Sequence, residues 1–196
     1  MAASNVNQAS LLAEVFSTVL RRYRPASVAV IGCAGGNGFD RIDPGTTTRV
    51  VGLDINQEYL DATARRYSEE FRELVLRNAD IAGDDLHLEP VDLSYAALIL
   101  EYVDVAAALR NLLSICREAG HLVAVLQRPS SPLPAITPTT IPSMMSLAAA
   151  MKVVDPLALV DAARGIGFAL RESASVTSSG GKQFAIHVYQ RLPKRR

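Results

Sequence analysis

The sequence predicts an α/β protein with a mostly parallel sheet, helices on both faces of the sheet and an antiparallel hairpin at the C-terminal end. Apolar segments that suit buried strands alternate with segments of helical periodicity, which is typical of parallel sheets. The last two strands, 168–177 and 183–192, are joined by a Ser-Ser-Gly-Gly turn and predict the hairpin. Neither a repeat nor a linker divides the chain, so we expect residues 1–196 to form one domain.

The first part of the chain predicts helices and strands in alternation. The first helix ends before Pro25 and carries apolar side chains at helical spacing, namely Leu11, Leu12, Val15, Phe16, Val19, Leu20 and Tyr23. A strand over 28–32 follows, and a short helix begins near Asn37 and stops before the turn at 43–45. The second strand, 49–54, leads into a helix with Asn56 as the expected N-cap. That helix presents Leu60, Ala64, Tyr67 and Phe71 on one face, and a third strand covers 74–80.

The remaining elements before the hairpin are a strand over 97–100, a helix over 105–118, a strand over 121–127 and a helix from 155 to near Gly165. Residues 128–142 hold five of the ten prolines, which excludes a regular helix or a central strand there. A short apolar helix follows, with Met144, Met145, Leu147, Ala148 and Met151. We expect residues 128–151 to form a lid over a ligand pocket; the alternatives are a cap on the core and a dimer contact.

Composition excludes several classes of protein. The formal net charge of zero argues against nucleic acid as a main partner, because phosphate binding needs a basic field. No apolar run approaches the roughly 18 residues of a membrane span, and the first residues lack a secretory signal, so we expect a cytoplasmic protein. The cysteines Cys33 and Cys116 predict reduced thiols, and three widely separated histidines predict no metal site. The sequence does not indicate an oligomeric state.

The loop after the first strand is the strongest functional signal. It contains Gly35, Gly36 and Gly38, and glycine is needed where a backbone turns sharply or a ligand approaches closely. A central parallel strand delivers such a loop to the carboxyl edge of its sheet, where nucleotides bind. Asp54 at the end of the second strand can accept hydrogen bonds from both hydroxyls of a ribose. The alternatives are a simple tight turn for the glycines and a helix-start carboxylate for Asp54.

The strings IGCAGGNG, VVGLDIN and LILEYV resemble class I S-adenosylmethionine-dependent methyltransferases, and the resemblance covers almost the whole chain. It implies a Rossmann-like, seven-stranded sheet of order 3-2-1-4-5-7-6 and S-adenosylmethionine as the cofactor. The cofactor-binding residues that the resemblance implies are Gly32, Ala34, Gly36 and Asn37 under the methionine and ribose, Asp54 on the ribose, Ile55 beside the adenine, Asp80 on the adenine amino group, Ile81 on the ring, and Leu100 near the methyl group. For Asp80, the alternative is an ordinary turn acid. The sequence departs from the family pattern at Val30, where many members carry an acid, and at Ala34, where a glycine is usual.

The resemblance places Glu101 and Tyr102 beside the methyl group to be transferred. Methyl transfer is an in-line displacement, so the protein supplies alignment and, for some acceptors, a base. Glu101 is the first candidate for that base, with His121 and Tyr102 behind it. The alternatives are a structural or cofactor contact for Glu101 and a solvent-facing edge position for His121. Arg128 could pair with an acceptor carboxylate or be a surface charge.

The function predicted from the sequence is methyl transfer to an unidentified, small-molecule acceptor. No Asn-Pro-Pro-aromatic or Pro-Cys motif follows the fourth strand, which argues against the methylation of nucleic-acid bases. One alternative is a non-catalytic protein that binds the adenosyl cofactor. An NAD(P)-dependent oxidoreductase is a weaker alternative. The loop lacks the strict G-x-G-x-x-G spacing that dinucleotide-binding proteins use.

Overall fold

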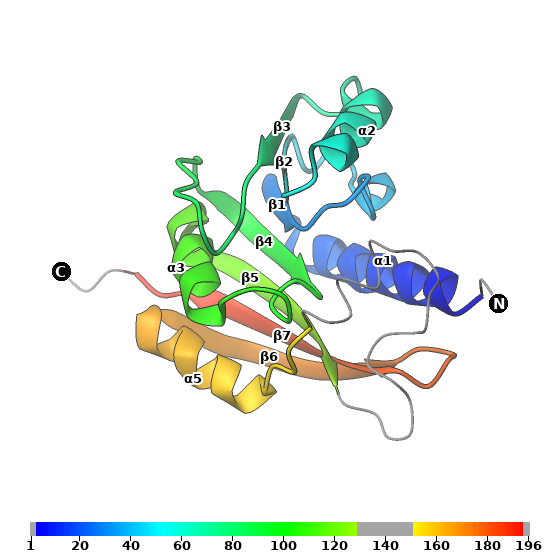
Figure 1. Cartoon of the computed structure of the whole chain (residues 1–196). Helices are drawn as coiled ribbons and strands as arrows, with labels where there is room; N and C mark the ends of the chain where they lie inside the picture. Colours follow the sequence, from blue (N-terminus) through cyan, green and yellow to red (C-terminus); the bar gives the residue numbers. More distant parts are fainter. Residues whose placement is uncertain (1–2, 129–150, 194–196) are drawn as a thin grey trace.

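A seven-stranded sheet of order β3-β2-β1-β4-β5-β7-β6 forms the centre of the structure (Figure 1). The structure is a computed structural model that describes residues 3–128 and 151–193. Its strands are β1 (Ser27–Ile31), β2 (Arg49–Asp54), β3 (Glu73–Asn78), β4 (Val91–Ala97), β5 (Cys116–Arg128), β6 (Phe168–Thr177) and β7 (Gln183–Arg191). Its helices are α1 (Ala3–Tyr23), η1 (Phe39–Arg41), α2 (Gln57–Tyr67), α3 (Val105–Ile115) and α5 (Pro156–Ile166). The predicted Rossmann-like fold and its strand order are confirmed.

The five strands β1 to β5 are parallel, and β7 lies antiparallel between β5 and β6. Ile31 at the end of β1 is in register with Leu53 of β2 and Ala96 of β4. The carboxyl ends of these three neighbouring strands therefore reach the same edge of the sheet, where α/β proteins bind their ligands.

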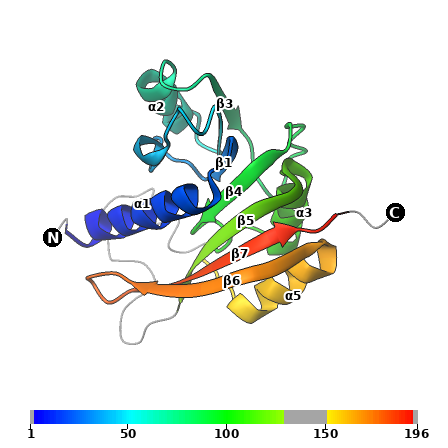
Figure 2. The ribbon, with the colours of Figure 1, turned by 180° about the vertical axis from the view of Figure 1, so that it is seen from behind.

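Helices cover both faces of the sheet because neighbouring residues of its central strands point to opposite sides. Val28 and Val30 pack in one cluster with side chains of α1 and α2, whereas Ala29 and Ile31 pack in a second cluster with α3 and α5. Figure 1 looks onto the face with α3 and α5, and Figure 2 onto the opposite face with α1. All five residues of β1 are buried, as expected for a strand covered on both faces.

Helix ends follow the signals in the sequence. The Asn56 side chain accepts a hydrogen bond from the Glu58 N–H at the start of α2, so the predicted N-cap is confirmed. Asp155 caps α5 in the same way, and Gly167 ends that helix with a positive φ of 114°. The residues at the two ends of α5 therefore determine where the helix stops and the first strand of the hairpin begins.

The predicted position of the fourth strand is wrong. We expected residues 97–100, but β4 is Val91–Ala97, and Leu98 turns the chain with a positive φ of 56°. Asp92 and Ser94 interrupt the apolar pattern of the real strand and hide it. The Asp92 carboxylate is nevertheless satisfied inside the sheet, because it accepts hydrogen bonds from the N–H and the hydroxyl of Ser27.

Smaller boundary differences follow from the same region. The expected helix over 105–118 ends at Ile115, and β5 begins at once with Cys116. The short helix expected from Asn37 is reduced to the single 3₁₀ turn η1. The predicted lid lies outside the described residues except for its two ends, Arg128 and Met151. Among the helices that the structure describes, none is long and apolar enough to cross a bilayer.

Candidate functional site

The glycine-rich loop is fixed to the neighbouring strand by its own backbone. The N–H groups of Gly32 and Cys33 both donate to the Leu53 carbonyl, at 2.8 and 3.0 Å. Farther along, the N–H groups of Gly36 and Asn37 both donate to the Cys33 carbonyl. Gly32 is exposed at the edge of the sheet and carries no Cβ, so a ligand can approach the backbone there.

The side chain of Asp54 joins the end of β2 to this loop. Its Oδ2 accepts a hydrogen bond from the Ala34 N–H at 2.8 Å, and its Oδ1 accepts one from the Asn56 N–H at 2.9 Å. A carboxylate has about four acceptor positions, so two remain for a ligand. Because the residue is only half-buried, those positions are within reach of a pair of ligand hydroxyls.

Ala34 and Gly36 shape the loop from within. Ala34 has a positive φ of 47°, and its carbonyl accepts a hydrogen bond from the Thr63 hydroxyl of α2 at 3.1 Å. Gly36 is buried, with a φ of +83°, and an added Cβ would lie 2.6 Å from the Tyr67 ring. These two predicted cofactor residues therefore hold the loop against α2.

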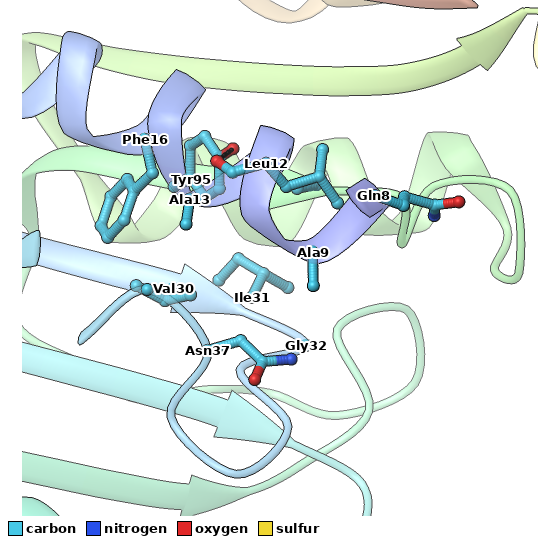
Figure 3. Close-up of a pocket in the computed structure, with 12 residues that line it drawn as sticks. Gln8, Ala9, Leu12, Ala13, Phe16, Val30, Ile31, Gly32, Asn37 and Tyr95 are labelled. Atoms are coloured by element: carbon cyan, nitrogen blue, oxygen red, sulfur yellow. Dashed lines mark hydrogen bonds between the residues drawn. The ribbon is translucent and has the colours of Figure 1, made fainter. Parts of the chain in front are cut away.

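A cavity of about 450 Å³ opens beside the loop, between α1 and the ends of β1 and β4 (Figure 3). Its lining residues are Gln8, Ala9, Leu12, Ala13, Phe16, Val30, Ile31, Gly32, Asn37, Gly38, Tyr95 and Ala97. In Figure 3, Ala9 of α1 points toward the loop that carries Asn37. The Tyr95 hydroxyl donates to the Leu12 carbonyl at 3.0 Å and so joins β4 to α1.

Glu101 is fully buried after β4, in the turn that leads to α3. Its Oε1 accepts a hydrogen bond from the Gln127 N–H at 2.7 Å, at the end of β5. Its Oε2 has no hydrogen-bond partner among the described residues. Burial raises the pKa of this carboxyl, although the hydrogen bond from Gln127 opposes the effect. Glu101 does not line the cavity beside the loop, but braces the β4 end against β5.

The raised pKa of Glu101 predicts a pH dependence of stability. A carboxyl with a higher pKa in the folded protein stabilises the fold at low pH, and this contribution declines as the pH rises above the ordinary glutamate value of about 4.3. In that range, wild type should lose up to about 1.4 kcal/mol per pH unit relative to Glu101→Gln. Urea unfolding of both proteins across this range measures the difference. Parallel curves would contradict it, and Glu69→Gln, at an exposed turn, is the control.

The structure does not bring the predicted catalytic residues together. Tyr102 is half-buried in the same turn as Glu101, and burial and the Glu101 charge both raise its pKa. His121 lies opposite Leu93 and Gln190, six residues before Gln127, which is about 20 Å at the usual rise of a strand. Its ring contacts the Tyr23 ring of α1 in a tilted arrangement with centroids 4.3 Å apart, and burial lowers its pKa. His121 is therefore remote from the carboxyl edge of the sheet.

The residues predicted to contact an adenine are only partly available. Ile55 is 72% exposed directly after β2, so its side chain is free to cover a flat ring. Asp80 is exposed, and its Oδ1 accepts a hydrogen bond from the Ala82 N–H. Ile81, in contrast, is buried in the core on the α3 side of the sheet, and so is Leu100, which was predicted to lie near the methyl group.

Sequence reasoning missed the cavity walls on α1 and β4. Tyr95 points to the same side of the sheet as Val30, because the two residues are in register on neighbouring strands. With β4 placed correctly, Tyr95 would have been recognised two residues before the end of the strand. The described part of the chain also holds no group of three or more histidine, cysteine or acidic side chains that could bind a metal.

Residues 29–124 match the family described as a methyltransferase domain. Among solved structures, N-methyltransferase NodS from Bradyrhizobium japonicum WM9 is 15% identical with a TM-score of 0.69, over 97% of this chain and 99% of that chain. Geranyl diphosphate C-methyltransferase from Streptomyces coelicolor A3(2) is 14% identical with a TM-score of 0.69, over 91% and 77%. The [4+2]-cyclase SpnF is 12% identical with a TM-score of 0.70, over 92% and 81%. A search of curated proteins found no match.

The fold is that of class I S-adenosylmethionine-dependent methyltransferases. The resemblance seen in the sequence is confirmed by the match of residues 29–124 to the methyltransferase domain family. The matched region runs from β1 to β5 and so includes the glycine loop, Asp54 and Glu101.

Proposed function

We propose that this protein binds S-adenosylmethionine and transfers its methyl group to a small-molecule acceptor. The observation that carries the proposal is the Asp54 carboxylate, which holds the glycine loop through Ala34 and keeps acceptor positions for a ribose diol. The family match supports methyl transfer, and the neighbours named as N- and C-methyltransferases support a small acceptor.

The residues present fit the adenosyl part of the cofactor. Asp54 would accept from the ribose hydroxyls, the exposed Ile55 would cover the adenine, and Asp80 would accept from its amino group. Gly32 and Asn37 would border the sulfur-bearing tail, while Ala34 and Gly36 keep the loop in shape. When bound, the cofactor supplies an electrophilic methyl group, so the protein must above all align the acceptor.

Glu101 and Tyr102 remain the proposed catalytic residues, since they follow the β4 end. Burial raises the pKa of Glu101, which makes its carboxylate a stronger base. Its hydrogen bond from Gln127 supports a positioning role equally well. The Glu101→Gln variant separates the two roles: turnover falls if Glu101 accepts a proton and stays near wild type if the side chain only braces the turn.

Calorimetric titration with three ligands tests the proposed cofactor. We expect micromolar affinity for S-adenosylmethionine and S-adenosylhomocysteine, and no heat from NADH, because Asp54 and the loop suit an adenosyl ligand while the loop lacks dinucleotide spacing. Heat from NADH alone would refute the proposal. The same experiment excludes the oxidoreductase alternative if only the adenosyl ligands bind.

A second candidate function is adenosyl-cofactor binding without methyl transfer. It is favoured by the cavity, whose lining offers no carboxylate, histidine or lysine that could act as a base within residues 3–128 and 151–193. The likeness to a protein named as a cyclase is a reminder that one fold serves different chemistries. Release of S-adenosylhomocysteine in a screen of hydroxyl, amine and carboxylate acceptors separates the two functions.

We further propose that residues 1–196 act as one cytoplasmic domain with no nucleic-acid partner. The single sheet from β3 to β6 supports one domain. Cys33 and Cys116 are both free and buried, which suits a reducing compartment. Burial raises the pKa of each of the two thiols to about 12, so neither is activated as a nucleophile. The balanced charge supports a small-molecule partner rather than a polyanion.

A further inference from the structure

Among the residues that the structure describes, none that lines the cavity beside the glycine loop carries a charged side chain. Apart from Gln8, Asn37 and Tyr95, its lining is apolar or glycine. Burial raises the pKa of Tyr95, so this hydroxyl stays neutral, and its proton is already donated to the Leu12 carbonyl. Two neutral amides are thus the only polar side chains that the described residues offer to a ligand in this space.

The cavity adjoins the proposed ribose site directly. Asp54 ends β2, Ala97 ends β4 and Gly32 follows β1, and these three neighbouring strands lie about 4.8 Å apart. Gly32 and Ala97 line the cavity, whereas Asp54 lies one strand farther away. A ligand held by its ribose at Asp54 that continues across Gly32 therefore enters the cavity with its next group.

A cavity whose described lining carries no charge favours neutral ligand groups over charged ones. The amino-acid tail of S-adenosylmethionine carries an ammonium and a carboxylate, and each costs free energy when it leaves water without a charged or multiple hydrogen-bond partner. Each charge-assisted hydrogen bond to the tail would multiply affinity by about tenfold or more, but the cavity lining provides no charged partner for one. A neutral thioether meets no such cost.

We propose that the cavity lined by Gln8, Val30 and Asn37 receives an uncharged, largely apolar group, so that the protein also binds 5′-thioadenosines that lack the amino-acid tail. This inference rests on the proposed function, since the adenosyl part is held at Asp54. It makes the chain a receptor for neutral thioether nucleosides as well as for the full cofactor. The ligand class follows from the apolar lining and the two neutral amides.

Titration of wild type with S-adenosylhomocysteine and with 5′-methylthioadenosine tests this inference. We expect the two dissociation constants to agree within about tenfold, because the tail finds no charged partner. A preference of more than about tenfold for S-adenosylhomocysteine overturns the inference but leaves the proposed function intact. Failure of both ligands to bind refutes the proposed function itself, so the two failures are distinguishable.

Two isosteric variants test whether the amino-acid tail of S-adenosylhomocysteine lies in the cavity. Asn37→Asp and Gln8→Glu each place a carboxylate at the cavity without changing side-chain size, and Asn37 is exposed, so the fold should persist. The ratio of the two dissociation constants should shift by at least about threefold, because only one ligand carries charges. Gln183→Glu on β7 makes the same charge change away from the cavity and should not shift the ratio. An unchanged ratio in both cavity variants would overturn the placement.

Discussion

Replacing Asp54 by alanine should weaken the binding of S-adenosylhomocysteine by about tenfold to a hundredfold or more. Hydrogen bonds to a charged acceptor contribute about 1.5–3 kcal/mol, and the variant loses those to the ribose. It also releases the N–H groups of Ala34 and Asn56, so the loop and the start of α2 lose their common anchor. Calorimetry measures the affinity, and thermal unfolding monitors the fold.

Asp43→Ala is the matched control for this prediction. Asp43 also accepts a hydrogen bond from a backbone N–H, that of Gly45, but in a loop before β2, at the opposite end of that strand. Its loss should leave ligand affinity unchanged. If Asp54→Ala unfolds normally and binds as wild type does, another residue holds the ribose and the proposed site is wrong. Asp54→Asn keeps one acceptor for the loop, so its ligand affinity should fall between those of Asp54→Ala and Asp43→Ala.

Gly36→Ala should destabilise the fold by about 2–5 kcal/mol. The left-handed backbone at a φ of +83° costs a side chain roughly 1–2 kcal/mol. The new Cβ, 2.6 Å from the Tyr67 ring, adds about 1–3 kcal/mol of overpacking. The free energy of unfolding in urea measures the loss.

The neighbouring Gly35 provides the control for the glycine prediction. An added Cβ at Gly35 meets nothing within 4 Å and its φ is not in the left-handed region, so Gly35→Ala should be nearly neutral. Shortening the ring partner in Gly36→Ala/Tyr67→Leu should relieve the overpacking but not the backbone strain. Equal stability of Gly35→Ala and Gly36→Ala would contradict the role of Gly36 in packing the loop on α2.

Much of the fold was predictable because it follows from local patterns. The hairpin strand Phe168–Thr177 was predicted at its observed bounds, since a glycine-ended helix precedes it and a Ser-Gly turn follows it. The fourth strand was misplaced because Asp92 and Ser94 are satisfied or packed only once the sheet has formed. A half-buried carboxylate that is satisfied within the sheet looks like a surface residue in the sequence.

The candidate site was predictable only where a residue lies at the end of a correctly placed strand. Asp54 is such a residue, and the structure places it against the glycine loop. Leu100 was assigned to the cofactor through the family resemblance, and in the structure it packs in the core. The contact between α1 and Tyr95 joins segments 83 positions apart, and neither local sequence contains a signal for it.

The chain itself holds the glycine loop, through the hydrogen bond from the Ala34 amide to Asp54. A loop that is fixed by contacts within the protein loses little further conformational entropy when it meets a ligand. A rigid receptor of this kind gains affinity through the entropy it has already lost in folding. It follows that folding already supplies part of the free energy with which this protein recognises a ligand. The Asp54 carboxylate connects folding and ligand binding.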